Sequence, residues 1–312
     1  MVEGEINGKK VNVKKNRKKR GDAISVDRDR MEKKKGNIVK NLPIKVIAVT
    51  SGKGGVGKTN VVANLAFALT QINKKVLVLD ADLSLANLDV LLGISPKFNL
   101  HHVFLGEKKI SEIIVPGPGG MKIIPASSGV QELSELNKEQ RLNFIEEIER
   151  FEEDADVLLI DTGAGISSNV MYFNTVAQDI IVVTSPDPTS LTDAYALMKV
   201  MFFKYKEKNF KLLVNSTRSG KEAKEVYYNL SSVVNRFLPG LSIDYLGYVL
   251  FDNKIPNAIR KQRAVSEIYP DAQASKCFSA LADKICDLPL ALSSNSGNIK
   301  FFWKNLLVDD RR

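Results

Sequence analysis

The sequence contains few of the residues from which metal-based or disulfide chemistry is usually built. Its 312 residues include two cysteines and two histidines. Cys277 and Cys286 form no Cys-x-x-Cys pair, and the adjacent His101 and His102 have no cysteine or carboxylate nearby at metal-ligand spacing. We therefore expect two reduced, partly buried thiols, with the histidines at the surface or in a loop.

Long apolar runs are also missing. No segment approaches the ~18 consecutive apolar residues that a membrane-spanning helix needs. The lysine-rich N-terminus has no apolar stretch of the kind that directs secretion, so we expect a cytosolic protein. A composition of 44% hydrophobic and 26% charged residues is ordinary for a globular protein, and it allows a substantial core.

The net charge of +9 is concentrated at the N-terminus. Residues 1–40 hold 14 basic and six acidic side chains, a net charge of +8, whereas the other 272 residues carry +1. Because this segment has almost no aromatic residues, we predict that residues 1–41 form a disordered basic tail. The tail acts either as a solubilising arm or as an attractor of anionic lipid, nucleic acid or an acidic partner. The nearly neutral body is expected to bind no specific nucleic acid.

From residue 42 onward, short apolar runs alternate with helical or loop segments. Helices are predicted at residues 60–72 and 275–287. The predicted strands are residues 44–49, 76–79, 122–124, 157–160, 180–184, 211–214 and 246–250. The first two strands and the helix between them form a βαβ unit. The pattern predicts an α/β fold in residues 42–292, with a mostly parallel twisted sheet flanked by helices on both faces.

A phosphate-binding loop follows the first predicted strand. Residues 52–59 match G-x-x-x-x-G-K-[ST] between a strand and a helix, which is the context that this motif requires. Its glycines let backbone N–H groups turn inward around an anion, and the helix adds its positive N-terminal end. Lys58 is expected to reach the β and γ phosphates of ATP, and Thr59 to offer its hydroxyl to Mg²⁺. The predicted nucleotide-binding residues here are Gly52, Lys53, Gly54, Gly55, Val56, Gly57, Lys58, Thr59 and Asn60.

Carboxylates follow two of the predicted strands, where α/β sheets place their ligand crevice. Asp161 ends an apolar strand, as in a Walker B segment, and is predicted to hold Mg²⁺ through water. Gly163 would let the next backbone segment swing toward the γ-phosphate. Asp82 is a candidate for orienting the attacking water, and Asp80 is a further candidate for the Mg²⁺ shell.

The loop carries a second lysine, Lys53, and its form KGGVGKT resembles the deviant-Walker signature of the MinD/ParA group of P-loop ATPases. The resemblance extends over about residues 43–290. It implies an ATP-dependent homodimer in which Lys53 reaches the partner's nucleotide and adds positive charge for the transition state. It also implies that Asp82 is the switch I aspartate, that Asn215 contacts adenine, and that residues 251–264 form a second loop beside the base.

Several sequence segments resemble those of the FlhG branch of this group, also called YlxH or FleN. They are residues 80–93, 161–166 and 188–195, together with Asn60 directly after the loop threonine. Members of that branch regulate flagellar number and placement, which implies an FlhF-type GTPase and flagellar switch-ring proteins as partners. FlhG proteins often carry an N-terminal Asp-Gln-Ala motif that stimulates FlhF. This chain has Asp22-Ala23-Ile24 instead, so the resemblance does not extend that activity to its tail.

The C-terminal segment is predicted to contact a membrane. Residues 293–297 are typical of a flexible linker, and residues 298–312 have net charge +2 and contain the chain's only tryptophan. One helical face would carry Ile299, Phe302, Trp303 and Leu306. This pattern favours an amphipathic helix on an anionic membrane surface, at the inner face of the cell membrane. MinD and FlhG end in a comparable helix. The alternative is a helix that docks on the body and completes its core.

The sequence therefore predicts a dimerising switch ATPase that converts ATP to ADP and phosphate and cycles between cytosol and membrane. The alternatives are a ParA-like partition ATPase that binds nucleic acid, which the basic tail favours, and a MinD-like ATPase that positions cell division. An iron–sulfur carrier of similar fold would need a Cys-x-x-Cys pair that the sequence lacks. A small-molecule kinase would need an acceptor pocket that the sequence does not reveal.

Overall fold

Residues 44–82, 88–125 and 155–289 are described by a computed structural model of the chain. The predicted tail at 1–41, the linker at 293–297 and the C-terminal helix with Ile299, Phe302, Trp303 and Leu306 lie outside these ranges. Among the described residues, no helix combines the length and the apolar composition that crossing a bilayer requires.

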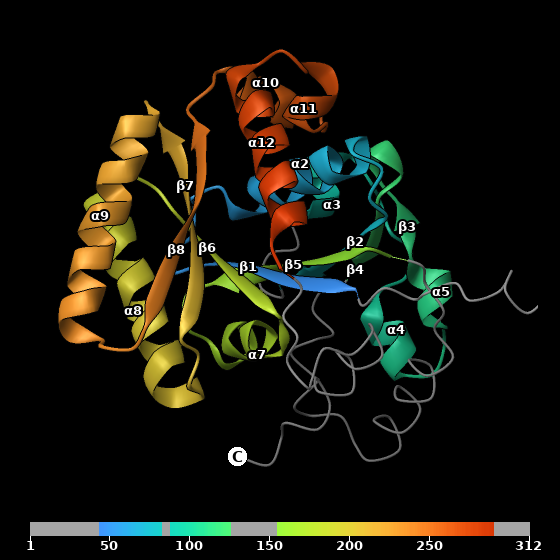
Figure 1. Cartoon of the computed structure of the whole chain (residues 1–312). Coiled ribbons are helices and arrows are strands. Elements are labelled where there is room, and N and C mark those ends of the chain that lie inside the picture. The colour runs from blue at the N-terminus through green and yellow to red at the C-terminus, as the bar shows by residue number, and fades with distance from the viewer. Residues whose placement is uncertain (1–43, 83–87, 126–154, 290–312) are drawn as a thin grey trace, which may run out of the picture. The chain divides into compact units, whose positions relative to one another are not determined.

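The core of the fold is one eight-stranded sheet with the strand order β3-β4-β2-β5-β1-β6-β7-β8 (Figure 1). Every pairing is parallel except that of β3 with β4. The prediction of a mostly parallel α/β sheet is thus confirmed. The strands are β1 (Lys45–Ser51), β2 (Val76–Ala81), β3 (Val115–Pro116), β4 (Lys122–Pro125), β5 (Val157–Ala164), β6 (Asp179–Thr184), β7 (Asn209–Thr217) and β8 (Ser242–Leu250).

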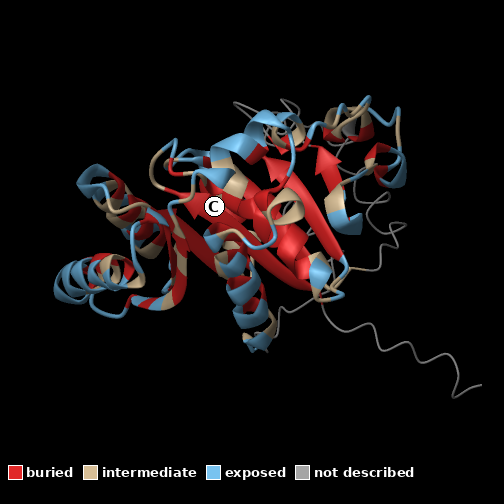
Figure 2. Ribbon diagram, turned by 90° about the horizontal axis from the view of Figure 1, so that it is seen from above, coloured by how far each residue is buried: buried red, intermediate tan, exposed pale blue. Residues whose placement is uncertain are grey.

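Helices cover both faces of the sheet, and Figure 2 shows the central strands buried beneath them. The helical elements are α2 (Lys58–Gln71), α3 (Leu88–Leu92), α4 (Leu100–Phe104), α5 (Ile110–Ile113), η1 (Pro118–Gly120), α7 (Ser168–Val176), α8 (Pro188–Tyr205), α9 (Gly220–Phe237), α10 (Lys254–Arg260), α11 (Val265–Ile268) and α12 (Gln273–Asp287). The layer on one face contains α2 and α12 together with α3, α10 and α11. On the opposite face, α4 and α5 cover one half of the sheet, α8 and α9 cover the other, and α7 contributes to both.

Because helices bury both faces of the sheet, the strands consist of continuous runs of apolar residues rather than alternating ones. Neighbouring side chains of β1 point to opposite sides, so that Val46 packs beneath the α4–α7 layer and Ile47 beneath α2. Leu158 and Leu159 divide in the same way on β5. In the resulting three-layer arrangement, the carboxyl ends of β1, β2 and β5 lie together. This carboxyl-terminal end of the sheet carries the candidate site.

A buried lysine joins the first strand to the last described helix. Lys45 is 6% exposed, and its Nζ donates hydrogen bonds to Ile285 O (2.9 Å) and Leu288 O (2.6 Å) at the C-terminal end of α12. Burial lowers the pKa of the Lys45 ammonium below its usual range. Carbonyl groups at a helix end lack intrahelical donors, so this lysine supplies partners that α12 does not.

Three details differ from the sequence-based expectations. The two-residue strand β3 is too short to show a period in the sequence. Strand β5 continues through Asp161 to Ala164, because its pairing with β1 and β2 extends past the apolar run. The histidines are not in a loop: His101 and His102 belong to α4 and are half-buried, and Asn99 caps this helix. The prediction for Cys277 and Cys286 is confirmed, since both are free and half-buried.

Candidate active site

The loop of residues 52–57 connects β1 to α2 and is shaped by its glycines. Gly55 and Gly57 have φ values of +82° and +87°, in the left-handed region that favours glycine. Gly52 packs against the backbone of α8 so closely that a Cβ there would lie 2.1 Å from Asp193 O. Gly57 is also the N-cap of α2, so no side chain caps the first N–H groups of this helix. These groups, and the positive helix end, are available to a phosphate.

Lys58 and Asp161 form a buried ion pair directly beyond the loop. The Lys58 Nζ to Asp161 Oδ1 distance is 2.5 Å, and the two side chains are only 6% and 1% exposed. Burial raises the pKa of the Asp161 carboxyl, while the Lys58 ammonium and the Thr59 hydroxyl oppose this increase. The structure therefore brings together Lys58, Thr59 and Asp161, which the sequence analysis assigned to one site.

The oxygen atoms around this pair fit a magnesium ion. Asp80 on β2 lies beside Asp161 in the sheet register and is 4% exposed. Burial, and then the neighbouring Asp161, raise the pKa of Asp80 to about 7. The second oxygen of Asp161, Oδ2, is buried and accepts no well-formed hydrogen bond within the described residues. Because Mg²⁺ prefers carboxylate and hydroxyl oxygens, Asp161, Asp80 and Thr59 are a suitable donor set.

Asp82 lies against the carboxyl-terminal end of β5. A Cβ placed on Gly163 would lie 3.5 Å from Asp82 Oδ1 and 3.3 Å from a methyl group of Val170. The residue directly after β5 is bonded to the P-loop strand, because the Gly165 N–H donates to Ser51 O at 2.8 Å. The two regions that the sequence analysis assigned to water orientation and to the moving backbone are therefore adjacent. A larger residue at Gly163 would press on the Asp82 carboxylate.

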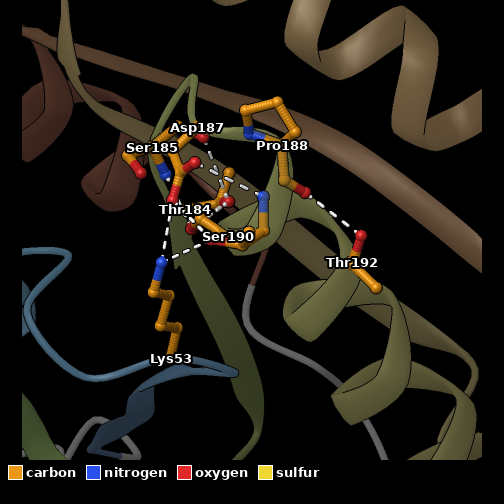
Figure 3. A network of polar contacts seen from close by, with 8 residues as sticks. Lys53, Thr184, Ser185, Asp187, Pro188, Ser190 and Thr192 are labelled. Atoms are coloured by element: carbon orange, nitrogen blue, oxygen red, sulfur yellow. Dashed lines mark hydrogen bonds and ion pairs between the residues drawn. The ribbon is translucent and has the colours of Figure 1, made fainter.

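Lys53 makes no contact with the Lys58–Asp161 pair in the described contacts and instead binds the N-terminal end of α8. Its Nζ lies 2.9 Å from Asp187 Oδ2 (Figure 3). It also donates to Thr189 Oγ1. Asp187 caps α8 and accepts hydrogen bonds from both the N–H and the hydroxyl of Thr189. Thr189 and then Lys53 lower the pKa of Asp187 to about 2. In the single chain, Lys53 thus has partners of its own.

Sequence reasoning missed Asp187 as a partner of Lys53. The sequence around Asp187 contains only a local pattern. An aspartate directly before a proline is typical of a helix N-cap. It predicts the beginning of α8 and contains no information about a lysine in a distant loop.

Asn215 lies near the carboxyl end of β7, which continues to Thr217, and its side chain contacts the P-loop. Its Nδ2 donates to Val56 O at 2.7 Å, and a Cβ on Gly57 would lie 2.5 Å from that nitrogen. A second asparagine, Asn64 on α2, was not singled out by the sequence. It is fully buried and accepts a hydrogen bond from the Ser266 N–H (3.3 Å), which joins α2 to α11. The adenine contact of Asn215 stays a prediction.

The arrangement can bind a triphosphate and hydrolyse it. It offers a row of backbone N–H groups, a buried ammonium, oxygen donors for a divalent cation and a carboxylate that can orient water. These groups come from β1, α2, β2 and β5, whose ends meet at one edge of the sheet.

Comparisons with known proteins agree with this geometry. The family described as "AAA domain" matches residues 44–214. The chain is 41% identical over 265 residues to the antiactivator FleN of Pseudomonas aeruginosa, covering 85% of this chain and 94% of FleN. It is 35% identical over 269 residues to the flagellum site-determining protein YlxH of Helicobacter pylori, covering 84% and 90% of the two chains. Among solved structures it resembles MinD of Pyrococcus horikoshii complexed with Mg-ADP, with 25% identity, a TM-score of 0.60 and coverage of 78% and 96%.

Proposed function

Because the chain belongs to the MinD/ParA family of P-loop ATPases, in the branch that includes FleN and YlxH, we propose that it is an ATP-dependent dimerising switch that regulates flagellar number and placement. The observation that carries this proposal is the buried Lys58–Asp161 pair directly beyond a glycine-rich loop. This pair places an ammonium and a metal-binding carboxylate where a nucleotide's phosphates would lie.

In the proposed reaction, ATP is hydrolysed to ADP and phosphate. The N–H groups of residues 52–59 and the Lys58 ammonium bind the phosphates, which requires Lys58 to leave Asp161. Asp161, Asp80 and Thr59 would hold Mg²⁺, which neutralises charge on the β and γ phosphates when it is bound. Asp82 accepts a hydrogen bond from the attacking water and orients it toward the γ-phosphate.

Dimerisation would complete the site by adding Lys53 from the partner. In the single chain this lysine is 40% exposed and Asp187 is 45% exposed. Ion pairs with that degree of exposure are weak, because water screens them. The triphosphate of a partner subunit offers a higher charge in a less hydrated setting, so Lys53 can leave Asp187 and Thr189 when two ATP-loaded chains meet.

Membrane contact and partner choice belong to the same proposal. Residues 298–312 would lie on an anionic membrane surface through Ile299, Phe302, Trp303 and Leu306, and two such helices in one dimer would bind more strongly than one. An FlhF-type GTPase and switch-ring proteins of the flagellar base are the proposed partners. The names of the relatives, an antiactivator and a flagellum site-determining protein, support a role in this process.

The molecular part of the proposal can be tested by measuring mass in solution by light scattering with ADP or with ATP and Mg²⁺. The wild type should be a monomer with ADP and a dimer with ATP. Asp82→Ala should accumulate the dimer, because hydrolysis is slowed. Lys53→Ala should bind fluorescent ATP but remain a monomer, whereas Lys221→Ala, on the exposed side of α9, should behave as the wild type. A wild type that stays monomeric when saturated with ATP would contradict the proposal.

The cellular role needs a separate measurement. Cells lacking the protein should carry an altered number of flagella by electron microscopy, and the wild-type gene should restore the normal number. A Lys58→Ala gene should fail to do so. Normal flagellation in the deletion strain would disprove the flagellar role while leaving the ATPase cycle intact.

A further inference from the structure

A groove lies beside the free edge of the sheet, between β8 and α12, with a cavity of about 340 Å³. We call it the edge groove. Among the described residues the sheet ends at β8, which is separated from β1 by β6 and β7. The two elements, labelled in Figure 1, are in close contact, because a Cβ on Gly247 of β8 would lie 2.9 Å from the Leu281 side chain of α12. Its main lining residues are Tyr245, Gly247, Tyr248, Lys276, Leu281 and Lys284.

The charges at the edge groove have one sign. Lys276 and Lys284 are both exposed on α12, and no carboxylate lines the cavity. Lys284 donates a hydrogen bond to Leu246 O (2.9 Å), and its ammonium lies 5.9 Å from the centre of the Tyr245 ring. Neither lysine forms an ion pair within the described residues. An occupant that brings carboxylates would therefore find two ammonium groups without acidic partners.

The lining of the groove also includes apolar and aromatic groups. Tyr245, Tyr248 and Leu281 line the cavity, and Ala280 is a small exposed residue of α12 that also lines it. Removing these apolar groups from water would favour an occupant that carries apolar side chains of its own.

The edge of β8 is poorly suited to pairing with another strand. The pairing of β7 with β8 shifts register between Leu212 and Leu213, and Gly247 has a φ of +153°. Two carbonyl groups of β8 already accept hydrogen bonds from side chains, Leu246 O from Lys284 and Ile243 O from Tyr227 (3.2 Å). A bulge and side-chain caps of this kind protect a sheet edge from strand addition. The occupant should therefore present side chains rather than a free backbone.

We propose that the edge groove is a docking site for an acidic amphipathic helix of a partner protein. The apolar face of the helix would pack on Tyr245 and Leu281, and its carboxylates would pair with Lys276 and Lys284. This chain's own segment 298–312 has net charge +2, so like charges would meet at the groove. None of the residues assigned to nucleotide binding lines the edge groove.

The test uses the full chain and two fluorescent peptides. Both carry leucine at i, i+3, i+4 and i+7. One has glutamate at the other positions, and its twin has lysine there. Fluorescence anisotropy should show the glutamate peptide binding at least about tenfold more tightly than the lysine twin. Lys276→Glu should weaken the glutamate peptide about three- to tenfold and strengthen the twin.

A matched pair of variants separates the groove from the rest of α12. Ala280→Trp fills the groove and should weaken binding of the glutamate peptide at least about tenfold. Ser279→Trp places the same ring on an exposed neighbouring position that does not line the groove, and should leave binding unchanged. ATP hydrolysis should be normal in both variants, so a failure here is distinguishable from a failure of the proposed ATPase function.

Three outcomes would overturn the proposal. The first is that neither peptide binds, or that both bind equally. The second is that the two tryptophan variants have the same effect. The third is that a synthetic peptide of residues 298–312 displaces the glutamate peptide and loses its own binding in Ala280→Trp, which would assign the groove to the chain's own C-terminal segment.

Discussion

Replacing Lys58 by methionine should strongly destabilise the nucleotide-free chain. Methionine keeps a long apolar stem but removes the ammonium that lies 2.5 Å from Asp161 Oδ1. Asp161 is fully buried, so its carboxylate would lose its partner without gaining water. Breaking a buried ion pair in this way typically costs about 3–5 kcal/mol. For a protein of this size, that corresponds to a fall of roughly 6–20 °C in Tm.

The loss should also depend on pH in a defined direction. Burial already raises the pKa of Asp161, and the variant lacks the ammonium that opposes this increase. A carboxyl whose pKa is higher in the folded than in the unfolded state binds its proton more tightly when folded. Its contribution to stability is present below the unfolded pKa and is lost as pH rises through the folded pKa. The difference between Lys58→Met and wild type should thus be smaller at pH 5.5 than at pH 8.

Urea unfolding followed by circular dichroism, without nucleotide or Mg²⁺, measures this effect. Lys58→Met combined with Asp161→Asn should recover much of the loss, because the double variant leaves no buried charge. Lys53→Met changes an exposed lysine of the same loop and should stay within about 0.5 kcal/mol of wild type. A Lys58→Met chain as stable as wild type at both pH values would refute the reasoning.

Three further outcomes are expected. Gly52→Ala should abolish binding of fluorescent ATP, because its Cβ would collide with the backbone of α8, whereas Gly54→Ala meets no atom within 4 Å and should leave the nucleotide-free fold unchanged by thermal unfolding. Asp187→Asn should lower the ATP concentration at which light scattering detects the dimer, since Lys53 loses its charged partner; an unchanged midpoint would argue against release of this contact. Lys45→Met should cost about 1–3 kcal/mol in urea unfolding, because two carbonyl groups of α12 lose a buried donor, while ATP hydrolysis per folded molecule stays normal.

The parts of the fold that follow from short stretches of sequence were predictable. The strand before the P-loop, the loop itself and the helix after it are contiguous, and each has a local pattern of apolar or glycine residues. The strand carrying Asp161 was predictable for the same reason, because a strand buried on both faces leaves a continuous apolar run. Their meeting at one sheet edge followed from the rule for parallel strands.

Contacts between distant segments were not predictable in this way. Lys53 and Asp187 are 134 positions apart, and Asn64 and Ser266 are 202 apart. Neither pair has a periodic or motif signal, because each contact depends on how α8 and α11 pack against the P-loop region. The edge groove is likewise a product of the angle between β8 and α12, which no single segment encodes.

The Lys45 contact has a mechanical consequence for whatever follows residue 289. Lys45 joins the end of α12 to the strand that leads into the P-loop, so the last described helix is hydrogen-bonded to the strand beside the nucleotide site. If a membrane or a partner exerted force on that segment, two hydrogen bonds would transmit the force from the end of α12 to β1. The two Lys45 hydrogen bonds would thus be a direct route by which force applied after residue 289 reaches β1.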